Sequence, residues 1–267
     1  MCLIIHKPAG VEVPADLIES AWADNDDGAG IMYMDGPGTG TARTPTVYKV
    51  VPGSWADPAA HVTRCLAGLT DREVGIHFRW RTHGPVNEAN THPYEIPGGA
   101  GYVMHNGILR LPKDYAAVAA TTSDTGFYVN TVLRGAPECA DEEFWNIVGE
   151  DIGNGNKFLV MDATGSFLRV NAKQWNVYRG LHLSNSYSIP ENTNWRRAWQ
   201  AGDGYKVDYS DLYPTTRSVD RKVISLPGEF ASARVTPPPA RLTRKERKVF
   251  SACLRAGHWG PFEALSK

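Results

Sequence analysis

The sequence predicts an α+β protein built from layers of sheet and helix, because short strand patterns dominate its first two thirds and a few helices interrupt them. The strand patterns are apolar and β-branched runs that Gly, Pro and Asp residues separate. They lie at residues 2–6, 30–34, 46–51, 74–80, 101–105, 156–162, 166–171 and 181–187. Helices are expected at 57–69, 125–133 and 141–150.

Residues 74–80 give the clearest strand pattern. Apolar residues at the even positions alternate with Gly75, His77 and Arg79. Because successive side chains of a strand point to opposite faces, Arg79 should lie on the face away from the apolar set.

Cap and turn residues limit the other elements. Asp57 precedes a first-turn proline, and Asp141 precedes two glutamates, so both should cap helices. Asp124 is expected to cap the helix at 125–133. Residues 163–165 should form the turn of a hairpin.

Composition excludes several classes of protein. Of 267 residues, 42% are hydrophobic and 21% are charged, as in folded globular proteins. The net charge of -1 lacks the basic excess of a dedicated nucleic-acid binder. The apolar runs are far shorter than the roughly 20 residues of a membrane-spanning helix, and the first residues do not resemble a signal peptide. A cytoplasmic protein is expected.

The pattern loosens near residue 190, so we expect a first domain at 2–190 and an irregular extension at 191–267. The extension has several proline-linked segments and should end in an amphipathic helix at 241–256, where Thr243 and Glu246 form a capping box. This helix has six basic residues and one acidic residue, which fits either a solvated face or docking to an acidic partner or nucleic acid.

Five short motifs occur in a definite order in the first domain. They are Cys2, DNDDGAG at 24–30, HFRWRTHG at 77–84 with NEANTHP at 87–93, HNG at 105–107 and SDT at 123–125. Together they resemble the glutaminase domain of the class II glutamine amidotransferases, which are N-terminal nucleophile (Ntn) hydrolases. The resemblance covers residues 2–190 and implies a four-layer αββα sandwich.

Cys2 is the candidate nucleophile. Removal of Met1 would leave a thiol and an α-amine on one residue, and an amine with a pKa of about 7.7 to 8.0 is a base suited to neutral pH. The resemblance implies that this thiolate attacks the side-chain amide of glutamine, releases ammonia and leaves a γ-glutamyl thioester. The competing interpretation is a buried strand cysteine with no catalytic role.

Asn106 and Gly107 match the oxyanion hole of the family, in which the asparagine side chain and the glycine N–H are the donors. Taken alone, an Asn-Gly pair after a strand also indicates a hairpin turn. Both interpretations remain open at this point.

Arg79 matches the arginine that binds the carboxylate of glutamine, and Asp124 supplies the opposite charge for its ammonium group. Arg81 is the alternative, because it would share the face of Arg79 if the strand continued. His83 and Gly84 should shape the loop behind Arg79.

Two further pairs have structural roles in this interpretation: Asn90 and His92 should support the pocket wall, and Asp27 and Gly28 should form a turn near the nucleophile. The histidines of the first domain lack HxH or HExxH spacing, and the four cysteines are scattered singly. We therefore expect no metal, no other cofactor and no disulfide framework.

The preferred function is a glutaminase that passes ammonia to a separately encoded acceptor enzyme. No nucleotide-binding motif follows residue 190, so no fused synthase is recognised. One alternative is an Ntn amidohydrolase acting on another γ-glutamyl or acyl amide. The other is an inactive Ntn fold that serves as a regulatory or binding subunit.

Overall fold

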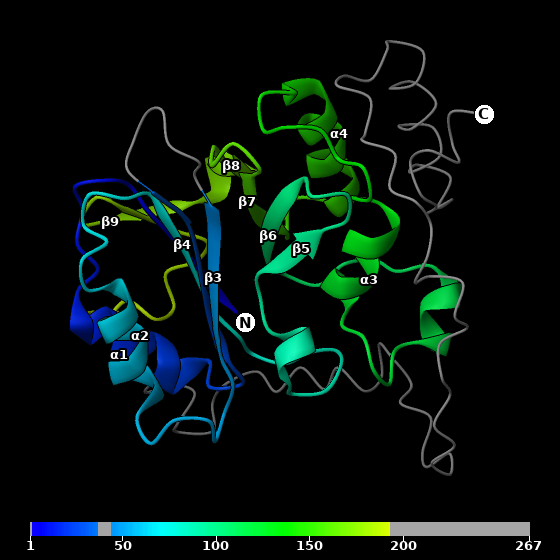
Figure 1. Ribbon diagram of the computed structural model, residues 1–267. Helices are drawn as coiled ribbons and strands as arrows, with labels where there is room; N and C mark the ends of the chain where they lie inside the picture. Colours follow the sequence, from blue (N-terminus) through cyan, green and yellow to red (C-terminus); the bar gives the residue numbers. More distant parts are fainter. Residues whose placement is uncertain (1, 37–43, 193–267) are drawn as a thin grey trace. The chain divides into compact units, whose positions relative to one another are not determined.

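The computed structural model describes residues 2–36 and 44–192. In these ranges the chain forms two antiparallel sheets together with α-helices, as Figure 1 shows. This agrees with the α+β class that the sequence predicts. The helix expected at 241–256, and nearly all of the extension at 191–267, lie outside the described residues.

A six-stranded sheet is built around β1, which starts directly after Cys2. Its strands are β1 (Leu3–Lys7), β2 (Ala29–Asp35), β3 (Thr44–Val50), β4 (Val74–Phe78), β9 (Asn176–Tyr178) and β10 (Leu181–Leu183). The strand order is β3-β2-β4-β1-β10-β9. Strand β1 pairs with β4 on one side, Leu3 opposite Phe78, and with β10 on the other, Ile5 opposite Leu183.

A four-stranded sheet carries the HNG motif. Its strands, in the order in which they pair, are β5 (Tyr94–Ile96), β6 (Gly101–Asn106), β7 (Lys157–Asp162) and β8 (Phe167–Val170). Strands β7 and β8 form the hairpin expected at 163–165, and the Asp162 carboxylate accepts from the N–H groups of Thr164 and Ser166.

The helices are α1 (Ala15–Asp24), α2 (Pro58–Leu66), α3 (Asp124–Thr131) and α4 (Glu142–Ile152). Short 3-10 helices lie at Glu88–Asn90, Lys113–Ala117 and Ala172–Gln174. Helices α1 and α2 pack on the six-stranded sheet, and α3 and α4 pack on the four-stranded sheet. Figure 1 shows the two pairs on opposite sides.

Alternating side chains divide the core into layers. In β1, Leu3 and Ile5 pack against α1 and α2, whereas Ile4 faces the second sheet. In β7, Phe158 packs toward α3 and α4, whereas Leu159 lies in the cluster that contains Ile4. Both sheets thus bury two faces, in the order helices, sheet, sheet, helices.

The cap predictions are mostly confirmed. Asp57 accepts from the N–H of Ala60 at 2.9 Å, and Asp141 caps α4 in the same way. For α3 the prediction is wrong, because Ser123 is the N-cap and Asp124 is the first helical residue. The Ser123 hydroxyl accepts from the N–H of Gly126, which is the bond expected of a cap.

One α-helix and two strands are not predicted by the sequence. Helix α1 begins after Pro14, whose side chain makes no cap hydrogen bond, so no cap residue marks its start. Strands β5 and β9 have three residues each, too few for an alternating pattern to be seen.

Two predicted strands are too long. The strand expected at 74–80 ends at Phe78, and the strand expected at 181–187 ends at Leu183. In both places the chain leaves the sheet where polar residues begin, and those residues contribute to the site described below.

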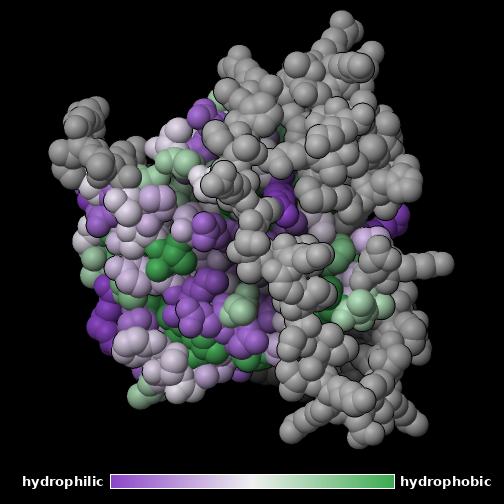
Figure 2. Space-filling model, turned by 45° about the vertical axis from the view of Figure 1, so that its right-hand side comes forward, coloured by the Kyte–Doolittle hydropathy of each residue, from purple (hydrophilic) through white to green (hydrophobic). Residues whose placement is uncertain are grey.

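The exposed large hydrophobic side chains of the described residues are Tyr48, Trp55, Trp80, Val177 and Tyr187. On the face shown in Figure 2, hydrophilic side chains lie between the hydrophobic ones. No helix in the described part of the chain is long and apolar enough to cross a membrane.

Candidate active site

Five segments of the chain meet in one pocket. They are the start of β1, the residues after β4, His92 just before β5, the end of β6 and the first turn of α3. The pocket is lined by Cys2, Arg79, Trp80, Thr82, His83, His92, His105, Gly107, Ser123, Asp124 and Thr125. Most of the site residues expected from the sequence are therefore brought together.

Cys2 is held by the pairing of β1 with β4. Leu3 lies opposite Phe78, so the preceding cysteine lies beside the residues that follow β4. Its Sγ is 3.3 Å from both the N and the O of Trp80. Burial raises the pKa of the Cys2 thiol, although its contact with the Trp80 backbone acts in the opposite direction. A base is therefore needed to form the thiolate near neutral pH.

Arg79 lies in the pocket wall because β4 ends just before it. Its side chain is only 3% exposed, and its guanidinium donates to the carbonyl oxygens of His83 and Pro85 at 3.0 Å each. Arg81 is exposed and does not line the pocket, and its backbone N–H donates to Asp27 at 2.7 Å. The geometry therefore favours Arg79 over Arg81 as the arginine of this site.

The turn expected at Asp27 and Gly28 holds these residues in position. The Asp27 N–H donates to the Arg79 carbonyl, and the Arg79 N–H donates to the Gly28 carbonyl at 2.7 Å. The turn thus continues the pairing of β2 with β4 beyond the start of β2 and the end of β4. Neither residue lines the pocket, which agrees with a structural role.

Asp124 provides the second buried charge. It is 4% exposed and accepts from the N–H groups of Leu109 and Thr125 at 3.1 and 2.9 Å. His83 Nδ1 lies 3.9 Å from its Oδ2. One pocket therefore holds a fixed positive group, Arg79, and a fixed negative group, Asp124, beside the Cys2 thiol.

The loop behind Arg79 is tied to the start of α3 through Asn90. The Asn90 Oδ1 accepts from the Ser123 N–H at 2.7 Å, and its Nδ2 donates to the Thr121 carbonyl at 2.9 Å. Gly84 has a φ of 68° and passes so close that a Cβ there would lie 2.8 Å from the Ser123 nitrogen. This packing fits the predicted roles of Gly84 and Asn90 in shaping the pocket.

Asn106 and Gly107 do not form a hairpin turn. Strand β6 pairs with β5 and β7, and the chain continues from Gly107 into α3 and α4 before it returns as β7. Gly107 has a φ of 141°, and a Cβ there would lie 2.1 Å from Asn156 Oδ1. Gly107 lines the pocket, whereas Asn106 is 4% exposed and donates through Nδ2 to the Ser184 hydroxyl at 2.7 Å.

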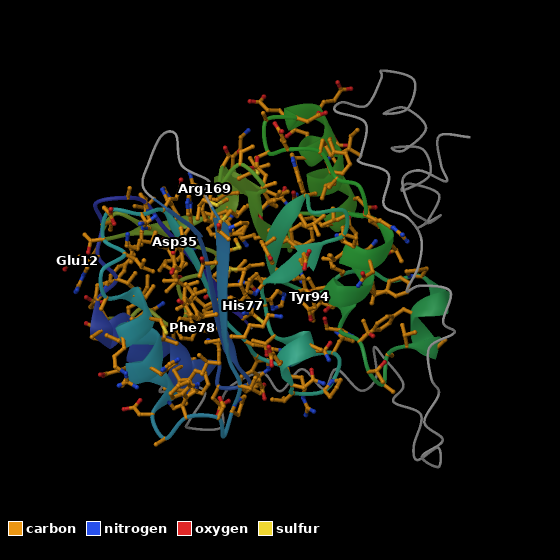
Figure 3. The ribbon with its side chains drawn as sticks, viewed as in Figure 1. Glu12, Asp35, His77, Phe78, Tyr94 and Arg169 are labelled. Atoms are coloured by element: carbon orange, nitrogen blue, oxygen red, sulfur yellow. The ribbon has the colours of Figure 1, made fainter. Side chains whose placement is uncertain are left out.

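Three buried histidines are neutral near pH 7: His92 and His105, which line the pocket, and His77, whose ring stacks on His92. Burial lowers the pKa of His77 to about 3, and it lowers the pKa values of His92 and His105 as well. Figure 3 shows His77 on one sheet and Tyr94 on the other. The His92 ring contacts both, with centroid distances of 3.9 Å to His77 and 4.9 Å to Tyr94. None of these three imidazoles can supply a positive charge to stabilise the Cys2 thiolate.

His105 links two parts of the site. Its Nδ1 is 2.7 Å from Thr125 Oγ1, next to Asp124, and its Nε2 is 2.8 Å from Asn156 Oδ1, next to Gly107. Its backbone carbonyl accepts from His77 Nε2 at 2.9 Å. The described residues contain no group of three His, Cys, Asp or Glu side chains that could hold a metal ion.

Five pocket residues were given no role in the site from the sequence: Trp80, Thr82, His105, Ser123 and Thr125. All five belong to the HFRWRTHG, HNG and SDT motifs, but the sequence alone assigned none of them a catalytic or charge-binding role. Their positions within those motifs were the available signal.

Comparison with known proteins gives a partial match. No family model matches the chain. Over 146 residues it is 31% identical to the glutamine--fructose-6-phosphate aminotransferase [isomerizing] of Aeropyrum pernix, covering 54% of this chain and 21% of that protein. The enzyme of the same name from Mycolicibacterium smegmatis is 32% identical over 146 residues, which are 50% of this chain and 23% of the relative.

A shorter match reaches higher identity. The enzyme of the same name from Corynebacterium efficiens is 48% identical over 62 residues, which are 23% of this chain and 10% of the relative. The resemblance predicted from the motifs is thereby confirmed. The chain is similar to these glutamine--fructose-6-phosphate aminotransferases over about half of its own length.

The match spans less than a quarter of these relatives' length. The candidate residues Cys2, Arg79, Gly107 and Asp124 line one pocket. Asn106 does not line it and precedes Gly107 at the end of β6.

Proposed function

We propose that this chain is a glutamine amidotransferase that hydrolyses the side-chain amide of glutamine to glutamate and ammonia, with Cys2 as an N-terminal nucleophile. The observation that carries the proposal is the pair of buried opposite charges, Arg79 and Asp124, in the pocket of the Cys2 thiol. Burying two charges costs desolvation free energy, and a zwitterionic ligand that pairs with both of them would offset this cost.

The amino-acid end of glutamine fits this pair. Two N–H groups of Arg79 are bonded to carbonyl oxygens, and a guanidinium has five, so three remain for a carboxylate. Asp124 accepts two backbone N–H groups, and a carboxylate has about four acceptor positions, which leaves capacity for an ammonium group. An acyl amide without an α-amino acid end would use neither charge.

Cys2 would act after Met1 is removed. The α-amine takes the thiol proton, and the sulfur attacks the amide carbon to form a C–S bond and a tetrahedral oxyanion. The amine then returns the proton to the leaving nitrogen, the C–N bond breaks and ammonia departs. Water hydrolyses the γ-glutamyl thioester, so that glutamate leaves and the thiol is restored.

Asn106 and Gly107 would stabilise the oxyanion with a side-chain N–H and a backbone N–H. The raised pKa of the buried Cys2 thiol supports the need for a built-in base, because the thiol is protonated near pH 7. The neutral His77, His92 and His105 carry no positive charge that would stabilise the thiolate.

The layer order also supports an Ntn-type domain. Two helix layers enclose two antiparallel sheets, and the candidate nucleophile precedes a central strand of one of them. This layer order is compatible with the αββα sandwich that the resemblance implies. We further propose that the ammonia passes to a separately encoded acceptor synthase and that the enzyme works in the cytoplasm without a metal or other cofactor.

The test is ammonia and glutamate release from glutamine by the purified chain, with intact mass measured on the same sample. We expect active protein to have lost Met1. Cys2→Ser should fold and lose nearly all turnover, because a serine hydroxyl is a far poorer nucleophile beside the same weak base. Cys65→Ser, which changes a thiol outside the pocket, is the matched control and should keep full activity.

The alternatives give different results. An amidohydrolase of another specificity would cleave a γ-glutamyl amide or an acyl amide faster than glutamine. An inactive binding subunit would retain Met1 and release ammonia no faster than the Cys2→Ser variant. Activity in a preparation that retains all its Met1 would refute the amine as the base.

A further inference from the structure

The segment that follows β10 contacts both sides of the proposed catalytic machinery. Strand β10 pairs with β1, and the pairing continues one residue past the strand, where the Ser184 N–H donates to the Ile4 carbonyl at 2.9 Å. Ser184 is 1% exposed and does not line the pocket. No sequence motif pointed to it.

The Ser184 hydroxyl bridges the two sheets. Its oxygen accepts from the Ile4 N–H at 2.8 Å, on the strand that follows Cys2. It also accepts from Asn106 Nδ2 at 2.7 Å, at the end of β6. A hydroxyl oxygen has two acceptor lone pairs, so these two bonds use both of them.

The bond to Ser184 sets the orientation of the Asn106 amide. An amide NH2 group is planar, so fixing one N–H by a hydrogen bond also fixes the direction of the other. That second N–H is the proposed oxyanion donor. Its position relative to β1 therefore depends on an oxygen that is itself bonded to β1.

The next residue holds the nucleophile. Asn185 Nδ2 donates to the Cys2 carbonyl at 2.7 Å, and Asn185 Oδ1 accepts from the Tyr187 N–H at 3.1 Å. Two adjacent side chains thus fix the backbone of the nucleophile and the side chain of the oxyanion donor. This one segment therefore contacts both the residue of the nucleophile and the proposed oxyanion donor.

We propose that Ser184 is a positioning residue, which acts through Asn106 to align the oxyanion hole with Cys2. The inference rests on the proposed glutaminase function. Oxyanion donors act at 2.7–3.1 Å from the developing charge, and a misplacement of about 1 Å can cost about a hundredfold in rate. Neither Arg79 nor Asp124 is bonded to Ser184, so glutamine binding should not depend on it.

The test is a double-mutant cycle on Ser184 and Asn106, with kcat and KM for glutamine measured separately. Ser184→Ala should lower kcat by about 10- to 100-fold and change KM by less than about threefold. Asn106→Ala should lower kcat further, and the double variant should be no slower than Asn106→Ala alone. Ser184→Thr keeps the hydroxyl and should restore kcat to within about threefold.

The control is Ser20→Ala, which removes another buried serine hydroxyl, bonded to the Ser188 carbonyl at 2.6 Å and outside the pocket. It should lower the Tm without lowering kcat. If Ser184→Ala does not fold, Ser184→Cys replaces it in the cycle, because sulfur is a weak acceptor of nearly the same shape.

Three results would overturn the inference. They are a normal kcat in folded Ser184→Ala, a loss that adds fully to that of Asn106→Ala, and a rise in KM without a fall in kcat. In each case an active wild-type protein would leave the proposed function standing. A wild-type protein that releases no ammonia from glutamine would overturn both proposals.

Discussion

Replacing Arg79 with lysine keeps a positive charge in the pocket and removes the guanidinium fork. Arg79 bonds to the carbonyl oxygens of His83 and Pro85 and retains three N–H groups for a substrate carboxylate. Lysine has three N–H groups in all and cannot make both sets of bonds. Losing one charge-assisted hydrogen bond costs about 1.5 to 3 kcal/mol, which is about 10- to 150-fold in binding.

The assay is the initial rate of ammonia release as a function of glutamine concentration. Arg79→Lys should raise KM by that factor and change kcat by less than about threefold, because the proposed contact is to the amino-acid end and not to the reacting amide. Arg81→Lys is the matched control. Its side chain is exposed, and the backbone N–H that donates to Asp27 is kept, so its KM should stay within about twofold of wild type.

The opposite pattern would refute the reasoning. If Arg81→Lys raised KM and Arg79→Lys did not, the carboxylate would be bound outside the described pocket. A fall in kcat alone for Arg79→Lys would place Arg79 at the reacting amide instead. A thermal melt of both variants excludes unfolding as the cause.

Three further predictions follow from the same geometry. Asn106→Ala should lower kcat by about a hundredfold or more at nearly constant KM in the ammonia assay, and a pure KM effect would contradict its oxyanion role. Burial lowers the pKa of His77 to about 3, so below pH 6.5 the unfolded chain binds a proton at this histidine that the folded chain does not. The free energy of unfolding therefore falls by about 1.4 kcal/mol per pH unit between pH 6.5 and pH 3. His77→Gln should remove this part of the acid sensitivity, which urea unfolding at pH 7 and pH 5 measures. An equal fall in the free energy of unfolding of the wild type and the variant would contradict this prediction. Gly30→Ala should prevent stable folding in a thermal melt, because its Cβ would lie 1.8 Å from the His92 carbonyl oxygen, whereas Gly155→Ala, with open space, should melt like wild type.

The sequence by itself determined the class of fold and most residues of the pocket. The alternation in residues 74–80 predicted a strand, which the structure has at Val74–Phe78, and Asp57 and Asp141 marked two helix starts. These signals are local, because they depend on residues within one or two turns of a helix or along one strand. The motif order behind Cys2 added the resemblance, which the comparisons confirmed.

The tertiary structure decided what local patterns leave open. An Asn-Gly pair after a strand fits a hairpin as well as an oxyanion hole, and only the pairing of β6 with β5 and β7 excluded the hairpin. Likewise, Arg79 and Arg81 would share a face if β4 continued, and the end of the strand at Phe78 separated them.

Ser184 gives the clearest case, because its hydroxyl bonds to Ile4 and to Asn106, which are 180 and 78 residues away. Such long-range contacts produce no periodic pattern in the amino-acid sequence. They arise where two sheets, each with its own local pattern, pack face to face and bring the ends of distant strands to one pocket.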